Sequence, residues 1–248
     1  MGDDRSALKQ LIDMDEFANR GNIDKKTLDM VFDRRTLEAL RTAFFRFNID
    51  YLDFPISSGK ESVVFRAVSG KKMLAVKIYK MSTLHFMNIR KYIEGDHRFS
   101  KERLDRGNIV LLWAKKEFTN LLQVRQKKVR TPVPIGFFKN VLVMSYLGTV
   151  ETPAPQLKDV NVSENTFIDV RDQMRKMYHA GIIHADLSEY NILVYRNKTY
   201  FIDMAQAVSA DHPAAEEFFE RDVKNISNFF EKRNINADCD DLKKYIKE

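Results

Sequence analysis

Apolar positions recur with two different periods along the chain, and the change of period divides it. Before about residue 50, apolar residues stand at helical spacing among charged ones, as at Leu37, Leu40 and Phe44. This spacing predicts two or three helices. From Phe54 the pattern is typical of strands, because "SVVFRAVSGKKMLAVKIYK" holds two β-rich runs around "SGKK". A short polar turn between two such runs predicts a β-hairpin.

The second half of the chain combines helical and short apolar segments. Residues 81–108 are polar and weakly periodic, which predicts a mobile insertion, and residues 109–128 then predict a helix that ends before "TPVPIG". The run "NVLVMSYLG" predicts a strand. The stretch "SENTFIDVRDQMRKMYHAG" predicts a helix that Ser163 caps and Gly181 follows. Three short apolar pieces come next, and the chain from about Ala214 is helical.

This order of elements predicts an α+β fold in which a β-rich half precedes a helical half. We expect an N-terminal helical extension over residues 1–50. A β-rich domain with the insertion follows over residues 51–147, and a helical domain over residues 148–248.

Composition limits the class of protein. The chain has 248 residues, of which 44% are hydrophobic, so it can bury a sizeable core. It contains no apolar run of about 18 residues, and "MGDDRSALKQ" lacks the apolar centre of a signal peptide. Its single cysteine, Cys239, excludes an internal disulfide and a zinc site built on cysteines. We therefore predict a soluble, cytoplasmic protein without a membrane partner.

The net charge of +6 is unevenly distributed. Residues 51–150 hold 19 basic and 7 acidic side chains, whereas residues 151–248 hold 13 basic and 18 acidic ones. A basic middle third suits phosphates, either of a nucleotide or of RNA. A solvated, lysine-rich surface is the alternative for any single lysine.

The stretch "HADLSEYNILV" carries the candidate chemistry. Asp186 and Asn191 stand five residues apart in a predicted loop, and Asp203 ends the apolar run "TYFID" twelve residues later. An Asp that accepts a hydroxyl proton, together with an Asn and a second Asp on Mg²⁺, is the equipment for phosphoryl transfer. We interpret the neighbouring His184 as a structural residue.

This set resembles the catalytic and metal loops of protein kinases. The resemblance requires a strand lysine for the nucleotide phosphates and a helix carboxylate to hold it. Lys77 in "LAVKIYK" fits, since it follows Ala75 and Val76 as in the kinase V-A-I-K strand. Lys80, at the exit of the same strand, is the alternative.

Three carboxylates are candidates for the lysine partner: Glu94, Glu102 and Glu117. Glu117 alone lies on an apolar helix face, which it shares with Trp113 and Leu121. A carboxylate among apolar neighbours usually has a cationic partner, so we assign Glu117 to Lys77. Pairing with a surface lysine such as Lys116 is the alternative.

A loop that covers the phosphates should precede Lys77, and "PISSGKESVVF" lies in the right place. It has one glycine, Gly59, in place of the three of the kinase loop. Its phosphate-binding candidates, including the adjacent acidic residue, are Ser57, Ser58, Gly59, Lys60 and Glu61. Val64 follows where the nucleotide base would rest. An ordinary turn between strands is the alternative.

The departures from ordinary kinases point to one family. "ISSGKES" is similar to the S-T-G-K-E-A loop of the RIO atypical kinases, and "HADLSEYNIL" and "IDMAQ" match their catalytic and metal loops. The stretch "DHPAAEEFFERDVKNISNFF" resembles the segment that follows in RIO proteins. "VFDRRTLEAL" and "WAKKEFTNL" indicate the type-one branch. The resemblance extends from about residue 30 to residue 232.

The resemblance implies a reduced, two-lobed kinase fold with extra N-terminal helices. It implies binding of ATP and Mg²⁺, with Mn²⁺ as a substitute, serine phosphorylation, and a role in maturation of the small ribosomal subunit through pre-ribosomal RNA and protein. Asp186 is then the catalytic base. Asn191 and Asp203 hold the metal, and Asp203 is a candidate to accept the phosphoryl group as an aspartyl-phosphate.

The resemblance also implies how adenine is held. The hinge "MSYLG" would bind the base through the backbone of Ser145 and Leu147, with Met144 behind it and Ile202 beside the nucleotide.

Two other functions remain open from the residues. Phosphotransferases of the aminoglycoside or choline type use the same H-x-D-x-x-x-x-N pattern, although their helical half is usually longer. An RNA-docking scaffold that binds ATP without turnover is the second. The chain after Asp203 holds no A-P-E and is too short for an activation segment, which favours an ATPase-driven switch over ordinary peptide phosphorylation.

Overall fold

A computed structural model of the protein describes residues 31–81, 89–102, 104–105 and 108–248. The described chain forms two compact units. The described part of the first unit contains residues 31–81, 104–105, 108–118 and 133–146. The second unit contains residues 89–102, 119–132 and 147–248.

The first unit is a five-stranded sheet with helices. Its elements are α4 (Arg34–Phe47), β1 (Tyr51–Ser58), β2 (Ser62–Ser69), β3 (Lys72–Tyr79), the first part of α6 (Ile109–Gln126), β4 (Pro134–Phe138) and β5 (Val141–Ser145). The strands are antiparallel in the order β1-β2-β3-β5-β4. The hairpin predicted around "SGKK" is confirmed as β2 and β3. The sequence analysis missed β4, because its proline and glycine are typical of a turn.

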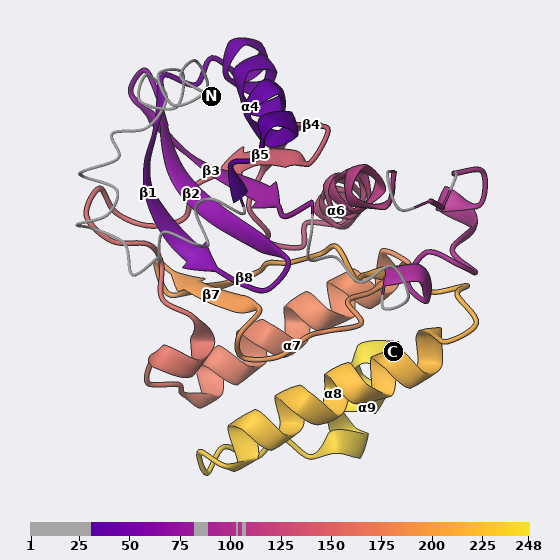
Figure 1. Ribbon diagram of the computed structural model, residues 1–248. Coiled ribbons are helices and arrows are strands. Elements are labelled where there is room, and N and C mark those ends of the chain that lie inside the picture. The colour runs from indigo at the N-terminus through magenta and orange to yellow at the C-terminus, as the bar shows by residue number, and fades with distance from the viewer. Residues whose placement is uncertain (1–30, 82–88, 103, 106–107) are drawn as a thin grey trace. The chain divides into compact units, whose positions relative to one another are not determined.

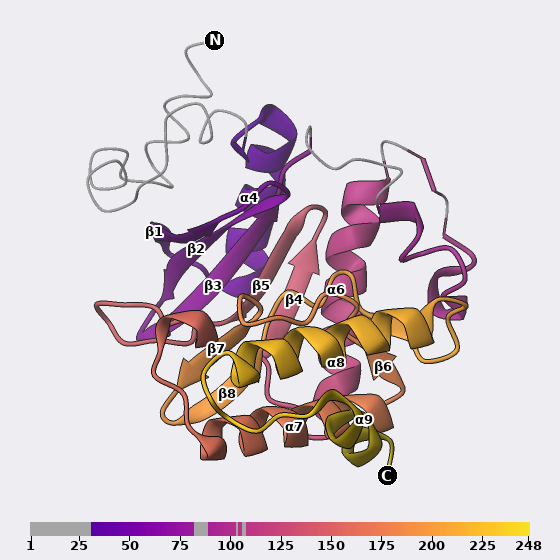
Figure 2. The same ribbon diagram turned by 90° about the horizontal axis from the view of Figure 1, so that it is seen from below.

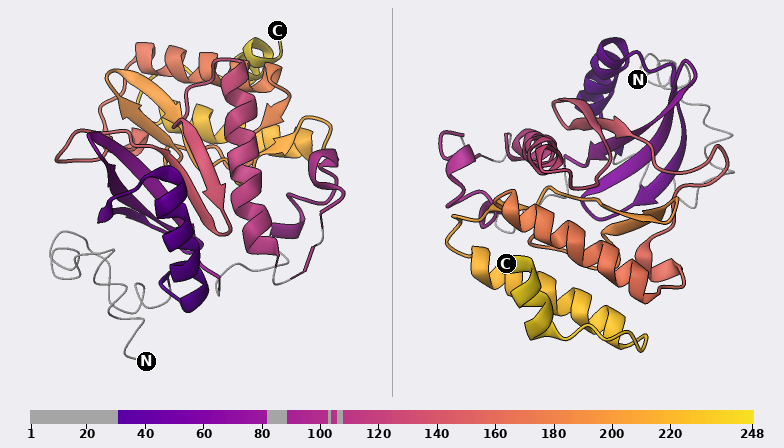
Figure 3. Two further views of the ribbon diagram at one scale, coloured as in Figure 1. Left: turned by 90° about the horizontal axis from the view of Figure 1, so that it is seen from above. Right: turned by 180° about the vertical axis from the view of Figure 1, so that it is seen from behind.

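Helix α4 packs on one face of this sheet (Figure 1; Figure 3, left). Leu40 and Phe44 from the helix share a buried core with Phe65 and Val76 from the strands. The side chain of Asp33 caps the helix by accepting a hydrogen bond from the N–H of Thr36 at 2.7 Å. Of the two or three helices predicted over residues 1–50, α4 is present, and residues 1–30 lie outside the described part.

The end of α4 explains the glycine in "TPVPIG". A Cβ atom at Gly136 would overlap the ring of Phe47, so β4 passes close to the helix only without a side chain there.

The second unit is mainly helical (Figure 2). Its elements are η1 (His97–Phe99), the second part of α6, η2 (Leu157–Asp159), α7 (Glu164–His179), β6 (Ile182–Ile183), β7 (Ile192–Tyr195), β8 (Lys198–Phe201), β9 (Val208–Ser209), α8 (Ala215–Glu231) and α9 (Cys239–Lys247). β7 and β8 form one hairpin, and β6 pairs with β9. None of the helices in the described ranges is long and apolar enough to cross a membrane.

The helix predicted from "SENTFID" is confirmed as α7. Ser163 Oγ caps it by accepting from the Thr166 N–H, and the Ser163 N–H donates to Thr166 Oγ1, which completes a capping box. Gly181 follows the helix with a φ of 71°, a conformation that glycine adopts without steric cost.

Part of the polar segment 81–108 is anchored in the second unit. Phe99 is buried, and Arg98 forms a 2.6 Å ion pair with the fully buried side chain of Asp96. Arg98 also donates to Asn120 and Gln123 of α6 at 2.8 and 2.9 Å. The predicted mobility of the segment stays a prediction, and residues 82–88 lie outside the described part.

Candidate active site

One face of the first unit's sheet carries the residues predicted to contact a nucleotide. Val64 lies directly opposite Lys77 in the β2–β3 pair, and Ala75 lies opposite Met144 in the β3–β5 pair. Because residues two apart on a strand share a face, these four side chains lie on the same side of the sheet. The other side packs on α4. The alternation of side chains along the strands thus places the apolar core on one face of the sheet and the candidate nucleotide-binding residues on the other.

The ion pair predicted between Lys77 and Glu117 is present. Lys77 Nζ lies 2.8 Å from Glu117 Oε2 and 3.1 Å from Oε1, and both side chains are almost fully buried. The hydroxyl of Tyr79 donates a second hydrogen bond to Glu117 Oε2. Two donors thus hold this carboxylate, as a buried charge requires.

Lys80, the alternative to Lys77, has a different contact. Its Nζ donates to the carbonyl of Gly59 at 2.7 Å, and its backbone N–H donates to Glu61 O at 2.9 Å. Lys80 therefore fixes the turn between β1 and β2. This turn contains the predicted phosphate-binding residues, of which Ser57, Ser58, Gly59 and Lys60 are exposed.

Internal hydrogen bonds already use part of the predicted hinge. The N–H of Ser145 donates to Val133 O at 2.8 Å, and the carbonyl of Leu147 accepts from Ala154 N–H at 2.9 Å. The N–H of Ser145 and the carbonyl of Leu147 are therefore already engaged within the protein.

The catalytic loop of the second unit orients Asp186 through two amides. Asn191 Nδ2 lies 3.3 Å from Asp186 Oδ2 and 2.8 Å from the Asp186 carbonyl. Gln206 Nε2 donates to the same Oδ2 at 3.2 Å. Within the described residues, Oδ1 accepts no hydrogen bond. One oxygen is thus fixed and the other remains able to accept a proton.

The surroundings of Asp186 favour its protonated form. Burial and the nearby negative charge of Asp203 raise the pKa of the Asp186 carboxyl above its usual value. Arg221, the Asn191 amide and Lys91 lower the pKa in part. A raised pKa strengthens a carboxylate as a general base.

Helix α8 holds the backbone of this loop. Asp222, which is 2% exposed, accepts from the N–H groups of Ala185 and Leu187, both at 2.8 Å. Arg221 donates to the carbonyl of Ala185. Ala185 has a φ of 65°, a costly conformation for a residue with a Cβ atom. Asp222 stabilises this conformation, and burial raises the pKa of Asp222 to about 7 against the effect of its two donors.

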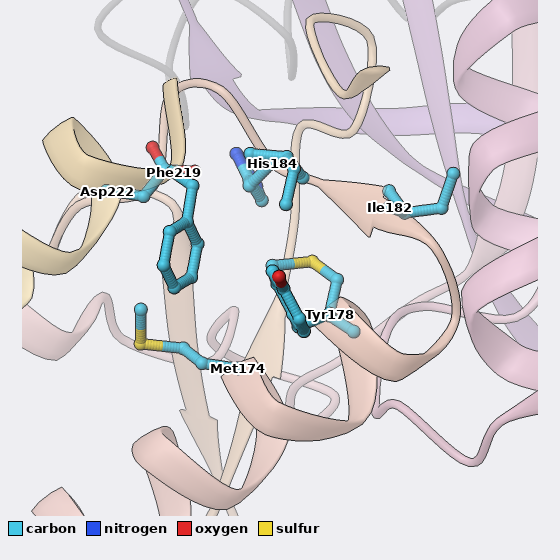
Figure 4. Close-up of a pocket in the computed structure, with 8 residues that line it drawn as sticks. Met174, Tyr178, Ile182, His184, Phe219 and Asp222 are labelled. Carbon is cyan, nitrogen blue, oxygen red and sulfur yellow. The ribbon is translucent and has the colours of Figure 1, made fainter. Parts of the chain in front are cut away.

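A small void of about 10 Å³ lies beneath the loop (Figure 4). Met174 and Tyr178 of α7 line one side of it, and Phe219 and Asp222 of α8 line another. His184 is fully buried beside the void, and its Nε2 contacts Ile202 O at 3.0 Å. His184 therefore joins the catalytic loop to the segment before Asp203, in agreement with the structural role predicted for it.

The β7–β8 hairpin brings the two predicted metal ligands to one end. Its ladder pairs Ile192 with Phe201, and the N–H of Ile202 extends it by donating to Asn191 O at 3.0 Å. Asn191 and Asp203 therefore flank the open end of the hairpin. Asp203 is exposed and has a φ of 60°, which Asp tolerates better than most residues.

These donors fit a magnesium ion. Asn191 uses its Nδ2 for Asp186, its amide oxygen makes no hydrogen bond with the described residues, and Asp203 adds a carboxylate. Oxygen ligands from one or two side chains, completed by phosphates and water, are typical of Mg²⁺ sites. Among the described residues, no group of three His, Cys, Asp or Glu forms a separate metal cluster.

Sequence reasoning missed four residues that support the site: Tyr79, Asn120, Gln206 and Asp222. Gln206 was visible in "IDMAQ" without an assigned contact. Asn120 is fully buried and donates to the carbonyls of Met204 and Ala207 at 2.7 and 2.9 Å. No local pattern marks these contacts, because the partners are distant in sequence.

The comparisons with known proteins decide the family. A family model described as RIO domain matches residues 63–243. The chain belongs to the RIO family. A relative from Thermoplasma acidophilum, described as RIO-type serine/threonine-protein kinase Rio1, is 62% identical over 186 residues, which are 75% of this chain and 100% of the relative. The Rio1 protein of Haloferax volcanii is 40% identical over 248 residues, covering 98% of this chain and 86% of the relative.

Solved RIO structures agree with this fold. A crystal structure of a Rio2 kinase–ADP/Mg²⁺–phosphoaspartate complex from Chaetomium thermophilum matches with a TM-score of 0.65 and 26% identity, and covers 84% of this chain and 65% of that one. The predicted kinase-like α+β fold and the RIO type-one family are thus confirmed. The protein is an atypical serine/threonine protein kinase, which sets aside the small-molecule phosphotransferase. The Rio2 complex supports the use of ATP and Mg²⁺ in the RIO family.

Proposed function

We propose that this RIO kinase transfers the γ-phosphoryl group of ATP with Asp186 as general base, and that it acts in maturation of the small ribosomal subunit. The proposed role of Asp186 as general base is supported by the geometry of its carboxylate. Two amides fix Oδ2, while Oδ1 accepts no hydrogen bond from the described residues.

Asp186 has a defined task in transfer to serine. Oδ1 accepts the hydroxyl proton while the serine oxygen forms a bond to the γ-phosphorus and the bond from that phosphorus to the β-phosphate oxygen breaks. The products are phosphoserine, ADP and a protonated Asp186, which returns its proton to water. Such proton transfer contributes about 10²–10⁴-fold to a rate.

Residues of the first unit bind the nucleotide in this proposal. Lys77 neutralises phosphate charge, and its contact with Glu117 fixes the ammonium group in position. The turn of Ser58, Gly59, Lys60 and Glu61 covers the phosphates, and Val64 and Ala75 contact the base.

The backbone of the hinge is complementary to adenine. The carbonyl of Ser145 accepts from the adenine amino group, and the N–H of Leu147 donates to a ring nitrogen. Met144 and Ile202 add apolar contacts. This assignment follows from the hydrogen bonds that the two residues already make.

Asn191 and Asp203 would hold Mg²⁺ through their side-chain oxygens, and Mn²⁺ would replace it at the same oxygen ligands. The bound ion supplies neutralisation of the charge on the β- and γ-phosphates.

An ATPase cycle is a second candidate, and the short connection after the metal loop favours it. Only residues 210–214 separate β9 from α8, so the described chain has no activation segment there for docking a peptide. In this cycle Asp203 takes the γ-phosphoryl group as ADP leaves. Water then attacks the phosphorus, and phosphate departs with the carboxylate restored. A phosphoaspartate is named in the Rio2 complex from Chaetomium thermophilum.

The ribosomal role rests on the resemblance of the sequence to RIO proteins. Co-sedimentation of the protein with small-subunit precursors in the presence of ATP tests it. Absence of the protein from those particles would contradict this part alone.

The chemistry is tested by following label from γ-labelled ATP in the wild type, Asp186→Ala and Asp203→Asn. Acid-stable label on serine that Asp186→Ala abolishes supports the kinase. Free phosphate, with a hydroxylamine-sensitive adduct that Asp203→Asn abolishes, supports the ATPase cycle. ATP binding without any turnover contradicts both and favours the scaffold.

A further inference from the structure

A second polar site lies in the second unit, apart from the residues assigned to catalysis. It is a pocket of about 340 Å³ between α7, α9 and the residue that follows α6. Its lining residues are Lys127, Asp172, Arg175, Lys176, His179 and Tyr245. α7 and α9 pack side by side there (Figure 2).

The pocket gathers three cations, Lys127, Arg175 and Lys176, and a single carboxylate. Lys127, Arg175 and Lys176 form no ion pair within the described residues. The one carboxylate of the lining, Asp172, accepts a 2.6 Å hydrogen bond from the hydroxyl of Tyr245 and lies 3.9 Å from Nε of Arg171. Arg98 of the same unit, by contrast, is paired with Asp96.

Two of the three cations stand in an acidic part of the chain. Arg175 and Lys176 belong to residues 151–248, which hold 13 basic and 18 acidic side chains, whereas Lys127 belongs to the basic middle third. Cations that converge without an anion repel one another, and an anionic ligand removes this repulsion.

One of the cations is pre-oriented. The guanidinium of Arg175 lies 5.0 Å from the ring centre of Tyr245, and that of Arg171 lies 4.3 Å from it. Stacking on an aromatic ring restricts a guanidinium, so less entropy is lost when it binds a phosphate with two hydrogen bonds.

Compensation of helix dipoles is the competing explanation. Lys176 and His179 lie in the last turn of α7, where cations stabilise a helix by about 0.3–1 kcal/mol each. That explanation accounts for Lys176 and His179 individually. It does not account for the convergence of Lys127, which follows α6, and Lys176 of α7 on one pocket.

We propose that Lys127, Arg175 and Lys176 bind phosphate groups of an RNA strand. The pocket is open and its charges come from long side chains, whereas a site for free phosphate usually adds a cradle of backbone N–H groups. Exposed Lys128 extends the charge beyond the pocket. Such a row of cations suits a polymer, whose binding is driven by counterion release. The site stands independently of the proposed function.

A labelled oligouridine tests the site by fluorescence anisotropy over a range of salt concentrations. The variant is Lys127→Gln with Lys176→Gln, and the control is Lys198→Gln with Lys232→Gln. All four lysines are exposed, and both variants lose the same charge. We expect the pocket variant to bind about tenfold more weakly than the control. The slope of the logarithm of the binding constant against the logarithm of the salt concentration should be smaller in magnitude by roughly 0.7 for each lost phosphate contact.

Equal affinity of the two variants would overturn the proposal, since net charge alone would then explain binding. Inorganic phosphate separates the two sources of ligand. If phosphate alone raises the melting temperature of the wild type but not of the pocket variant, while both bind RNA equally, the site takes free phosphate and the RNA assignment is wrong. Equal melting temperatures of both variants without ligand exclude a folding defect.

Discussion

Gln206 donates a hydrogen bond from its Nε2 to Oδ2 of Asp186 at 3.2 Å, across twenty residues of sequence. This bond joins the segment after Asp203 to the catalytic loop. It also leaves Oδ1 as the oxygen that can receive a proton, because Asn191 binds the same Oδ2.

Removal of the Gln206 amide should therefore slow the chemical step. We expect Gln206→Ala to lower kcat about tenfold or more, with little change in KM for ATP, because misplacement of a base by about 1 Å is costly. Gln206→Glu should be slower still, since it places a second carboxylate beside Asp186. Single-turnover kinetics with labelled ATP measure both.

Gln126 provides the control for this prediction, since it is an exposed glutamine at the end of α6. Gln126→Ala should leave kcat unchanged. An equal loss of ATP affinity and kcat in Gln206→Ala would instead indicate a general structural defect.

The buried pair of Lys77 and Glu117 should show strong coupling. Removal of one partner leaves a buried charge, so Lys77→Met or Glu117→Met should each lower the free energy of unfolding by about 3–5 kcal/mol. The double variant should lose less than either single variant. Denaturant unfolding of the four proteins measures the coupling, and additive losses would contradict it.

Tyr79 should matter for ATP binding through this pair. Tyr79→Phe removes only the hydroxyl that donates to Glu117, a hydrogen bond to a charged group worth about 1.5–3 kcal/mol. We expect ATP to bind several-fold more weakly in calorimetry. Tyr195→Phe, which changes a tyrosine in the β7–β8 hairpin, serves as the control.

Asn120 should support the segment that carries Asp203 and Gln206. Asn120→Leu keeps the approximate volume but leaves the carbonyls of Met204 and Ala207 without their donor, which costs about 1–3 kcal/mol for each buried group. We expect a lower melting temperature and slower ATP turnover. The same change at exposed Asn236 should alter neither.

Asp222 should make stability depend on pH. Its folded-state pKa of about 7 exceeds the ordinary pKa of 3.8 of an aspartate, so the folded protein binds more protons than the unfolded chain between these values. The contribution of Asp222 is therefore fully present below about pH 4 and is lost as the pH rises through 7.

The comparison with Asp222→Asn isolates this titration from that of other groups. Between pH 5 and pH 8, the wild type should lose roughly 2–3 kcal/mol of unfolding free energy relative to Asp222→Asn. Denaturant unfolding at both pH values measures the difference. A constant difference would show that the carboxyl does not titrate in this range.

Much of the fold could be predicted from local patterns. The hairpin around "SGKK", the α6 helix and the cap at Ser163 follow from periodicity and turn chemistry, which depend on near neighbours. β4 could not be predicted this way, since its place is decided by pairing with β5 and by the ring of Phe47 against Gly136.

The sequence by itself determined which residues are the candidates for the chemistry. Lys77, Asp186, Asn191 and Asp203 stand in motifs whose spacing is local, and the apolar helix face around Glu117 indicated a cationic partner. The tertiary structure decided what orients them, through Tyr79, Gln206 and Asp222. A hydrogen bond to a charged or catalytic group depends on atoms that folding brings within about 3 Å, and such proximity leaves no period in the sequence.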